Sequence, residues 1–357
     1  MTSFTRTIRR TAAVAVALAA GSAVLTGTAT AEAGTATAEA GTATGSAVTS
    51  APLVRGLYQS AYSERNDALW VTTAVGRPPV TNSSLLKVDP DTLAIEATYT
   101  PPVTDATTGA LEAVYGVAVD DEHNTVWTTN TRSNTVAVYS QKTGEHLATL
   151  PDVAHAREIV VDERHNTVWA SAFGSGTLVA YDSKTFEEKE RVTVEGSSPT
   201  GLAVNEKTGT VYAADLGGDR IIEVSRGSET PRFIPTGDGP ISVSLSKSGR
   251  YAYTADQTAG TVSVVNLKDG AVTKSVATGA GALSVTTDER SGNVLVANRT
   301  AADVTVVDPR EGAVVETVAT GANPNYVEVA DGTAYVVDKS GSGPAGEDLV
   351  TRISLGH

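Results

Sequence analysis

Two histidine-containing segments of the sequence resemble one another. HNTVW begins at His123 and again at His165, 42 residues later, and Asp120 and Asp162 precede these histidines by three residues. Carboxylate and imidazole groups at short spacing are typical of general acid–base catalysis. The aligned positions of other segments hold unrelated residue types: Arg65, Thr208 and Ser291. Such variety at one repeated position indicates a solvated turn rather than a catalytic group.

A second group of titratable residues lies between these two segments. His155, Arg157 and Glu158 occur within LPDVAHAREI and form the one plausible acid–base cluster of the chain. The sequence has no nucleophile elbow, metalloprotease helix motif, phosphate-binding glycine loop or dinucleotide fingerprint. It also contains no cysteine, which excludes disulfides, thiolate metal sites and a cysteine nucleophile. These three residues are therefore the candidates for catalysis.

The elements that position these residues repeat about every forty residues, which is the spacing of propeller blades. Seven segments align, and they begin at Leu57, Val114, Ala156, Pro199, Pro240, Ala282 and Pro324. Each contains short β-like runs separated by turn residues, and the first two runs are apolar on both faces, as in strands sandwiched between sheets. The pattern predicts an all-β, seven-bladed β-propeller with four-stranded blades.

The last repeat supplies only three strands and ends at residues 351–354. The segment SAVTSAPLV, residues 46–54, precedes the first repeat and has the composition of a further strand. We predict that it pairs as the outer strand of the last blade, because this would remove an exposed sheet edge and close the ring.

Three stretches of the repeat carry a family resemblance: VYAAD, AYTADQTAGTVSVVN and LVANRTAADVTVVDP. They resemble the YVTN repeat of YncE-like seven-bladed propellers, a WD40-like arrangement, over essentially the whole chain after residue 45. The resemblance implies the fold. It leaves the activity open, since related propellers include lactonases, binding proteins and proteins of unassigned role.

The N-terminus has the pattern of an export signal. Residues 1–31 combine a positively charged start, an apolar run and small residues in Ala-x-Ala spacing, which predicts a signal peptide. Residues 32–45 belong to a Gly/Ala/Thr-rich GTATAEA repeat and are interpreted as a leader or spacer. We therefore expect a propeller of residues 46–357 that is secreted, whether extracellular, cell-wall associated or periplasmic, without membrane insertion after signal cleavage.

The formal net charge of -14 repels phosphate backbones, so nucleic acid is not an expected partner. The residues that enter the innermost strand differ from repeat to repeat, as expected for a ligand-facing channel mouth. Together with an apolar residue after the second strand of the third repeat, they give the predicted ligand-binding set: Tyr58, Tyr115, Arg157, Glu158, Phe173, Asn325 and Tyr326. Long loops at residues 74–84, 101–113 and 339–348 are expected on one side of the same face, called here the upper face.

The residue that ends the second run of most repeats is Asn or Asp: Asn130, Asp215, Asp256, Asn298 and Asp338. Such a residue caps a hairpin through its short polar side chain. The alternative is a ring of oxygen ligands for Ca²⁺ or Mg²⁺. A ring of that width would hold the carboxylates too far apart for one ion, so we expect no metal and no cofactor.

The sequence favours a secreted, monomeric binding module over an enzyme, with an unknown small molecule or protein held on the upper face. The alternative is a lactonase-like hydrolase of sugar-acid lactones. It would use His155, Arg157 and Glu158, or a metal held by the Asn and Asp residues of the upper face.

Overall fold

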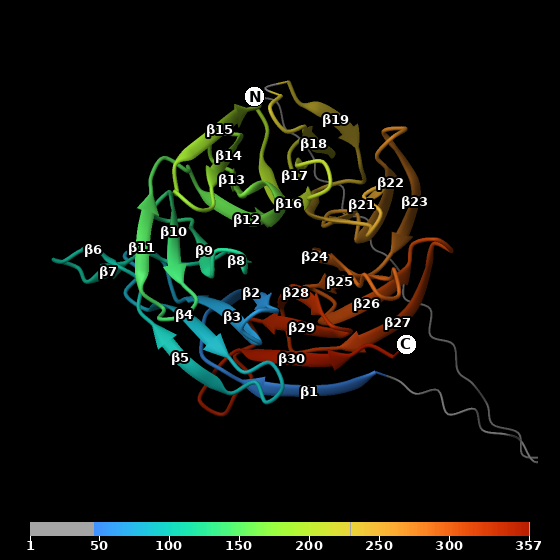
Figure 1. Ribbon diagram of the computed structural model, residues 1–357. Coiled ribbons are helices and arrows are strands. Elements are labelled where there is room, and N and C mark those ends of the chain that lie inside the picture. Colours follow the sequence, from blue (N-terminus) through green and yellow to red (C-terminus); the bar gives the residue numbers. More distant parts are fainter. Residues whose placement is uncertain (1–45, 229, 357) are drawn as a thin grey trace, which may run out of the picture. The chain divides into compact units, whose positions relative to one another are not determined.

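A computed structural model describes residues 46–228 and 230–356. These residues form seven four-stranded antiparallel sheets arranged as blades around a central channel (Figure 1). The predicted seven-bladed propeller is thereby confirmed. The predicted signal peptide and spacer, residues 1–45, lie outside the described residues. Within the described part of the chain, no helix is long and apolar enough to cross a membrane.

The first four blades follow the chain in order. Blade 1 consists of β2 (Leu57–Ser63), β3 (Ala68–Ala74), β4 (Ser83–Val88) and β5 (Ile95–Tyr99). Blade 2 consists of β8 (Val117–Asp120), β9 (Thr125–Asn130), β10 (Thr135–Ser140) and β11 (His146–Leu150). Blade 3 consists of β12 (Ala156–Asp162), β13 (Thr167–Ala172), β14 (Thr177–Asp182) and β15 (Glu188–Thr193), with the short 3₁₀ helix η1 (Glu163–His165) after β12. Blade 4 consists of β16 (Pro199–Asn205), β17 (Thr210–Asp215), β18 (Arg220–Val224) and β19 (Arg232–Pro235).

The remaining blades complete the ring. Blade 5 consists of β20 (Pro240–Leu245), β21 (Tyr251–Asp256), β22 (Thr261–Asn266) and β23 (Ala271–Ala277). Blade 6 consists of β24 (Ala282–Thr287), β25 (Val294–Asn298), β26 (Asp303–Asp308) and β27 (Ala313–Ala319). Blade 7 consists of β28 (Pro324–Ala330), β29 (Thr333–Asp338), β30 (Leu349–Ser354) and β1 (Ala47–Pro52). A small hairpin of β6 (Val103–Asp105) and β7 (Ala110–Leu111) projects from the ring between blades 1 and 2 (Figure 1).

The core lies between neighbouring blades. Every residue of β9 is buried, because both faces of this second strand are covered by adjacent sheets. Trp127 and Val138 of blade 2 belong to one apolar cluster with Val168 and Tyr181 of blade 3. The β-branched and aromatic residues of these strands suit such a two-sided environment. The blades are therefore held face to face, and the innermost strands line the channel.

The N-terminal strand closes the ring as predicted. β1 pairs antiparallel with β30, from Ala47 opposite Ser354 to Pro52 opposite Leu349. Figure 1 shows β1 in blue along the outer side of the red β30. Leu53, which follows β1, is buried in a cluster shared with blades 1 and 7. The first and last segments of the propeller are thus joined in one sheet.

The three long loops contact one another or the segment of Arg55 and Gly56, which precedes β2. The amide of Leu111 donates to the carbonyl of Val80 at 2.8 Å, which joins the first two loops. The Arg55 guanidinium donates to the carbonyl of Gly346 at 2.8 Å. Residues 74–76 and 339–341 line a common depression with Arg55 and Gly56. These contacts place the long loops on one side of the ring.

Candidate functional site

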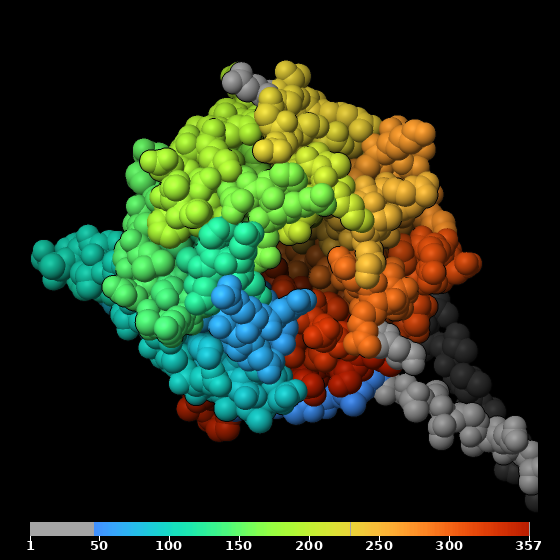
Figure 2. Space-filling view, viewed as in Figure 1, coloured from blue at the N-terminus to red at the C-terminus, as the bar shows by residue number. Residues whose placement is uncertain are grey.

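The central channel opens into a cavity of about 490 Å³ at the end where the innermost strands begin. This space is called the upper cavity. The surface is visibly hollowed at the centre of the ring (Figure 2). Most of the residues proposed from sequence for ligand binding or catalysis line the upper cavity: Tyr58, Tyr115, His155, Arg157, Glu158, Asn325 and Tyr326.

Backbone irregularities direct these side chains toward the channel. The pairing of β12 with β13 shifts register between Ala156 and Ile159, so Arg157 and Glu158 lie in a β-bulge. Equivalent shifts occur at Leu57/Ser60 in β2 and at Pro324/Tyr326 in β28. A bulge bends its strand and changes the direction of its side chains. The variable positions of the repeat therefore coincide with bulges at the channel entrance.

Hydroxyl groups on the second strands join the bulges of neighbouring blades. Ser171 Oγ accepts a hydrogen bond from the Glu158 amide at 2.9 Å and donates to the Thr200 carbonyl at 2.7 Å. Thr129 Oγ1 donates to the Arg157 carbonyl at 2.9 Å. These bonds satisfy backbone groups that the bulges leave out of the sheet. Hydrogen bonds from the second strands therefore fix the backbone of the bulges that line the upper cavity.

Tyr58 is the centre of one wall. Its ring meets the Tyr115 ring edge to face, with centroids 4.4 Å apart, and the Lys339 ammonium lies 3.6 Å from the Tyr58 centroid. Asn325 Nδ2 donates to the Tyr58 carbonyl at 2.7 Å, and Arg299 Nη1 donates to Asn325 Oδ1 at 2.5 Å. Burial lowers the pKa of Lys339 to about 8. Blades 1, 2, 6 and 7 thus contribute to one aromatic and cationic surface.

His155 and Arg157 line another part of the upper cavity, whereas Phe173, also predicted to bind ligand, does not line it and packs against these two side chains. The His155 ring lies 5.3 Å from the Phe173 ring, and the Arg157 guanidinium lies 5.8 Å from the same ring. Burial, reinforced by Arg132 and Arg157, lowers the pKa of His155, which favours the neutral imidazole. Burial also lowers the pKa of Arg157.

Glu158 and Glu328 both lie in the channel. Glu158 Oε2 accepts a hydrogen bond from Gln59 Nε2 at 3.0 Å. Burial raises the pKa of Glu158 to about 7, against the opposing effects of Gln59, the Ile159 amide and Arg157. Burial raises the pKa of Glu328 to about 7 as well, and the charge of Glu158 adds to this rise. Glu158 is half-buried and lines the upper cavity.

Several lining residues of the upper cavity were not predicted from the sequence, among them Arg132, Gln257 and Arg299. Gln257 and Arg299 directly follow Asp256 and Asn298, the last residues of their second strands. Phe173 occupies the equivalent position in blade 3, directly after the second strand, and was included in the predicted ligand-binding set because it is apolar. Applying that position to every repeat would have identified Gln257 and Arg299. Arg132 lies one residue further along its loop, so no repeated position marks it.

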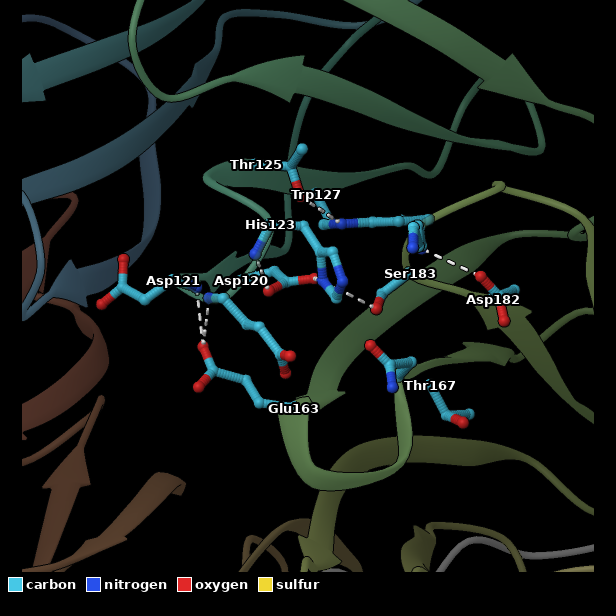
Figure 3. A network of polar contacts seen from close by, with 12 residues as sticks. Asp120, Asp121, His123, Thr125, Trp127, Glu163, Thr167, Asp182 and Ser183 are labelled. Carbon is cyan, nitrogen blue, oxygen red and sulfur yellow. Dashed lines mark hydrogen bonds and ion pairs between the residues drawn. The ribbon is translucent and has the colours of Figure 1, made fainter.

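The repeated histidines lie away from the upper cavity, in turns between first and second strands. His123 Nδ1 donates to Asp120 Oδ2 at 2.9 Å, and the His123 amide donates to Asp120 Oδ1 at 2.9 Å. In the same turn, the Asp121 amide donates to Glu163 Oε1 of the neighbouring turn at 2.6 Å, as Figure 3 shows. His165 and Asp162 repeat the arrangement with a ring contact of 2.8 Å. These pairs close turns and link adjacent blades.

The five candidate metal ligands are buried, and each is hydrogen-bonded to residues of its own blade or of an adjoining link. Asp256 accepts hydrogen bonds from Thr254, Thr261 and Ser263 at 2.8, 3.1 and 2.6 Å. The other four are bonded as follows: Asn130 to Glu112 and Thr135, Asp215 to the Ser198 amide and Arg220, Asn298 to Thr278, Asp303 and Thr305, and Asp338 to the amides of Ser340 and Leu349. A divalent cation would have to replace these hydrogen bonds.

Comparison with known proteins agrees with this architecture. The family model for YncE-like β-propellers matches residues 53–342. The curated relatives include an uncharacterized protein YncE from Escherichia coli O157:H7, 29% identical over 239 residues, which are 62% of this chain and 65% of the relative. The uncharacterized protein YncE of Salmonella typhi is also 29% identical, over 241 residues and the same shares of both chains. The match thus spans somewhat less than two thirds of these relatives. The chain belongs to the YncE-like β-propeller family.

Proposed function

We propose that the protein is a secreted binding module that holds a small molecule in the upper cavity. The observation that carries this proposal is the convergence of variable side chains from blades 1, 2, 3 and 7 on one space of about 490 Å³. A largely pre-formed concave site with a few directed polar groups is the usual form of a small-molecule site. The signal-like residues 1–31 support export.

The contacts in the cavity favour binding over hydrolysis. His155 packs against Phe173, whereas the Glu158 carboxyl is bonded to Gln59. A general base and a group that orients it are ordinarily hydrogen-bonded to one another. No such bond between His155 and Glu158 exists among the described residues. The lactonase-like hydrolase is therefore the second candidate.

A thermal-shift screen tests the proposal. The panel contains carboxylic acids, sugar phosphates, neutral sugars, amino acids and amines. We expect one class to raise the melting temperature of the wild type, and we expect Tyr58→Leu to lose that shift because it removes the aromatic wall beside Tyr115. Glu64→Gln, an exposed residue that lines a different cavity, is the matched control and should keep the shift.

Two results would contradict the binding module. One is a panel in which no compound changes the melting temperature of the wild type. The other is turnover of glucono-δ-lactone by the wild type that is lost in His155→Ala and Glu158→Gln. A Ca²⁺-dependent shift that disappears in Asp256→Ala would assign the metal-assisted form of the hydrolase.

A further inference from the structure

The upper cavity carries local positive charge although the whole chain is strongly acidic. Arg132, Arg157 and Arg299 line it, and Glu158 is its single acidic lining residue. Lys339 lies against the Tyr58 ring, with its ammonium 3.6 Å from the ring centroid, and lines the adjoining depression rather than the upper cavity. The formal net charge of the chain is -14, so a cluster of cations is not a consequence of composition.

The three arginines form no ion pair with a carboxylate among the described residues. The arginine ion pairs lie elsewhere, at Arg191, Arg220, Arg232, Arg310 and Arg352. The Arg299 guanidinium donates to the neutral Asn325, and the nearest aromatic contact of Arg157 is the Phe173 ring. Arg157 and Arg299 are half-buried, so their guanidinium groups bear a desolvation cost, which the Glu158 carboxylate offsets only in part at Arg157. An anionic ligand would supply the missing partner.

The arginines come from different parts of the ring. Arg132 follows β9 of blade 2, Arg157 lies on β12 of blade 3, and Arg299 follows β25 of blade 6. Since all three line one cavity, a compact ligand with more than one anionic group can contact several of them. Guanidinium groups bind carboxylate and phosphate oxygens through paired hydrogen bonds.

We propose that the upper cavity binds a small organic anion that bears carboxylate or phosphate groups, with Arg157 and Arg299 as its principal contacts. This inference rests on the proposed binding function and specifies its ligand class. Tyr58 and Tyr115 provide an aromatic wall for the carbon skeleton of the ligand. Because burial raises the pKa of Glu158 to about 7, its neutral form, which prevails below that pH, adds no negative charge to the cavity.

Calorimetric titration tests the ligand class. The probes are citrate for carboxylates, glucose 6-phosphate for phosphates and glucose as the neutral control. We expect at least one anion to bind and glucose to give no heat, with an affinity that falls as sodium chloride is added. Binding of citrate alone assigns carboxylates, and binding of glucose 6-phosphate alone assigns phosphates.

Two variants locate the site. Arg157→Gln and Arg299→Gln should each weaken anion binding about 10- to 100-fold, because each removes a charge-assisted hydrogen bond. Arg226→Gln, at an exposed turn after β18, is the matched control and should bind as the wild type does. Melting temperatures of all three variants establish that they fold. If one arginine variant does not fold, the other still tests the site.

Two outcomes would overturn the proposal. The first is that neither anion binds. The second is that both arginine variants bind the anion as tightly as Arg226→Gln does. If the thermal-shift panel instead yields neutral or cationic compounds whose effect depends on Tyr58, the binding module stands and only the anion assignment fails.

Discussion

At the scale of single residues, the channel contains titratable side chains whose charged forms are destabilised by burial. Burial lowers the pKa of Arg157 and raises the pKa of the adjacent Glu158 to about 7, although the two charges favour one another. Gln59 contacts this carboxyl and also accepts a hydrogen bond from the Val117 amide of the next blade at 3.2 Å. Perturbed titratable groups in a cavity are typical of functional sites. The account therefore predicts a stability that depends on the protonation of Glu158.

Glu158→Gln tests this dependence. The folded protein keeps the Glu158 proton up to about pH 7, whereas the unfolded chain releases it near the ordinary value of 4.5. The free energy of unfolding of the wild type therefore falls as the pH rises between these values. Because the variant cannot ionise there, we expect it to be more stable than the wild type by about 1–3 kcal/mol near pH 8, and equally stable below about pH 4.5.

Urea unfolding at several pH values measures this difference. Glu145→Gln, an exposed residue in the turn before β11, is the control and should show the same small difference from the wild type at every pH. A Glu158→Gln variant that is less stable than the wild type near neutral pH and above would show that the ionised carboxyl is stabilising.

Residue identity alone did not separate structural from functional polar groups. His123 with Asp120 and Glu158 with Arg157 have similar chemistry in the sequence, but the first pair closes a turn and the second lines the cavity. Both positions vary among the repeats. Position on the blade made the distinction, because the histidine turn follows the first strand whereas Arg157 and Glu158 lie near its start. It could not identify Arg132, whose side chain reaches the cavity from a loop that the repeat does not fix.

At the scale of elements, the strands follow from the sequence more directly than the site does. Fully buried second strands such as β9 combine β-branched and aromatic residues between turn residues, so their positions can be predicted from the sequence. The positions of the bulges cannot be predicted in this way, because the register shift at Arg157 and Glu158 depends on hydroxyl contacts with Ser171 and with the neighbouring blade. Long-range contacts of this kind leave no local pattern.

The closing strand gives a prediction at this scale. A chain that begins at Arg55 lacks β1 and leaves the edge of β30 unpaired, while a chain that begins at Ser46 keeps the strand. We expect the shorter chain to lose roughly 3–6 kcal/mol of stability, as estimated from six lost residue pairs. Calorimetric melting of both chains measures the loss, and a peptide of residues 46–54 should restore part of it. Equal melting temperatures would show that β1 does not hold the ring closed.

At the scale of the whole molecule, seven similar sheets produce a channel whose two ends differ. The upper cavity holds three arginines and one glutamate, whereas the cavity at the other end includes Glu64, Glu289, Glu328 and Asp331 beside Lys247 and Arg290. The repeat supplies the scaffold, and the non-repeated side chains at the ends supply this electrostatic difference. We therefore expect a small anion to bind at one end only.

Hydrogen exchange with and without saturating citrate measures whether the anion binds at this end of the channel. The account predicts slower exchange in the segments that enter the upper cavity: residues 55–60, 113–117, 155–159 and 323–327. It predicts unchanged exchange in the turns at the opposite end, including residues 63–67 and 288–292. Protection confined to those turns, or no protection anywhere in the propeller, would contradict an anion site in the upper cavity.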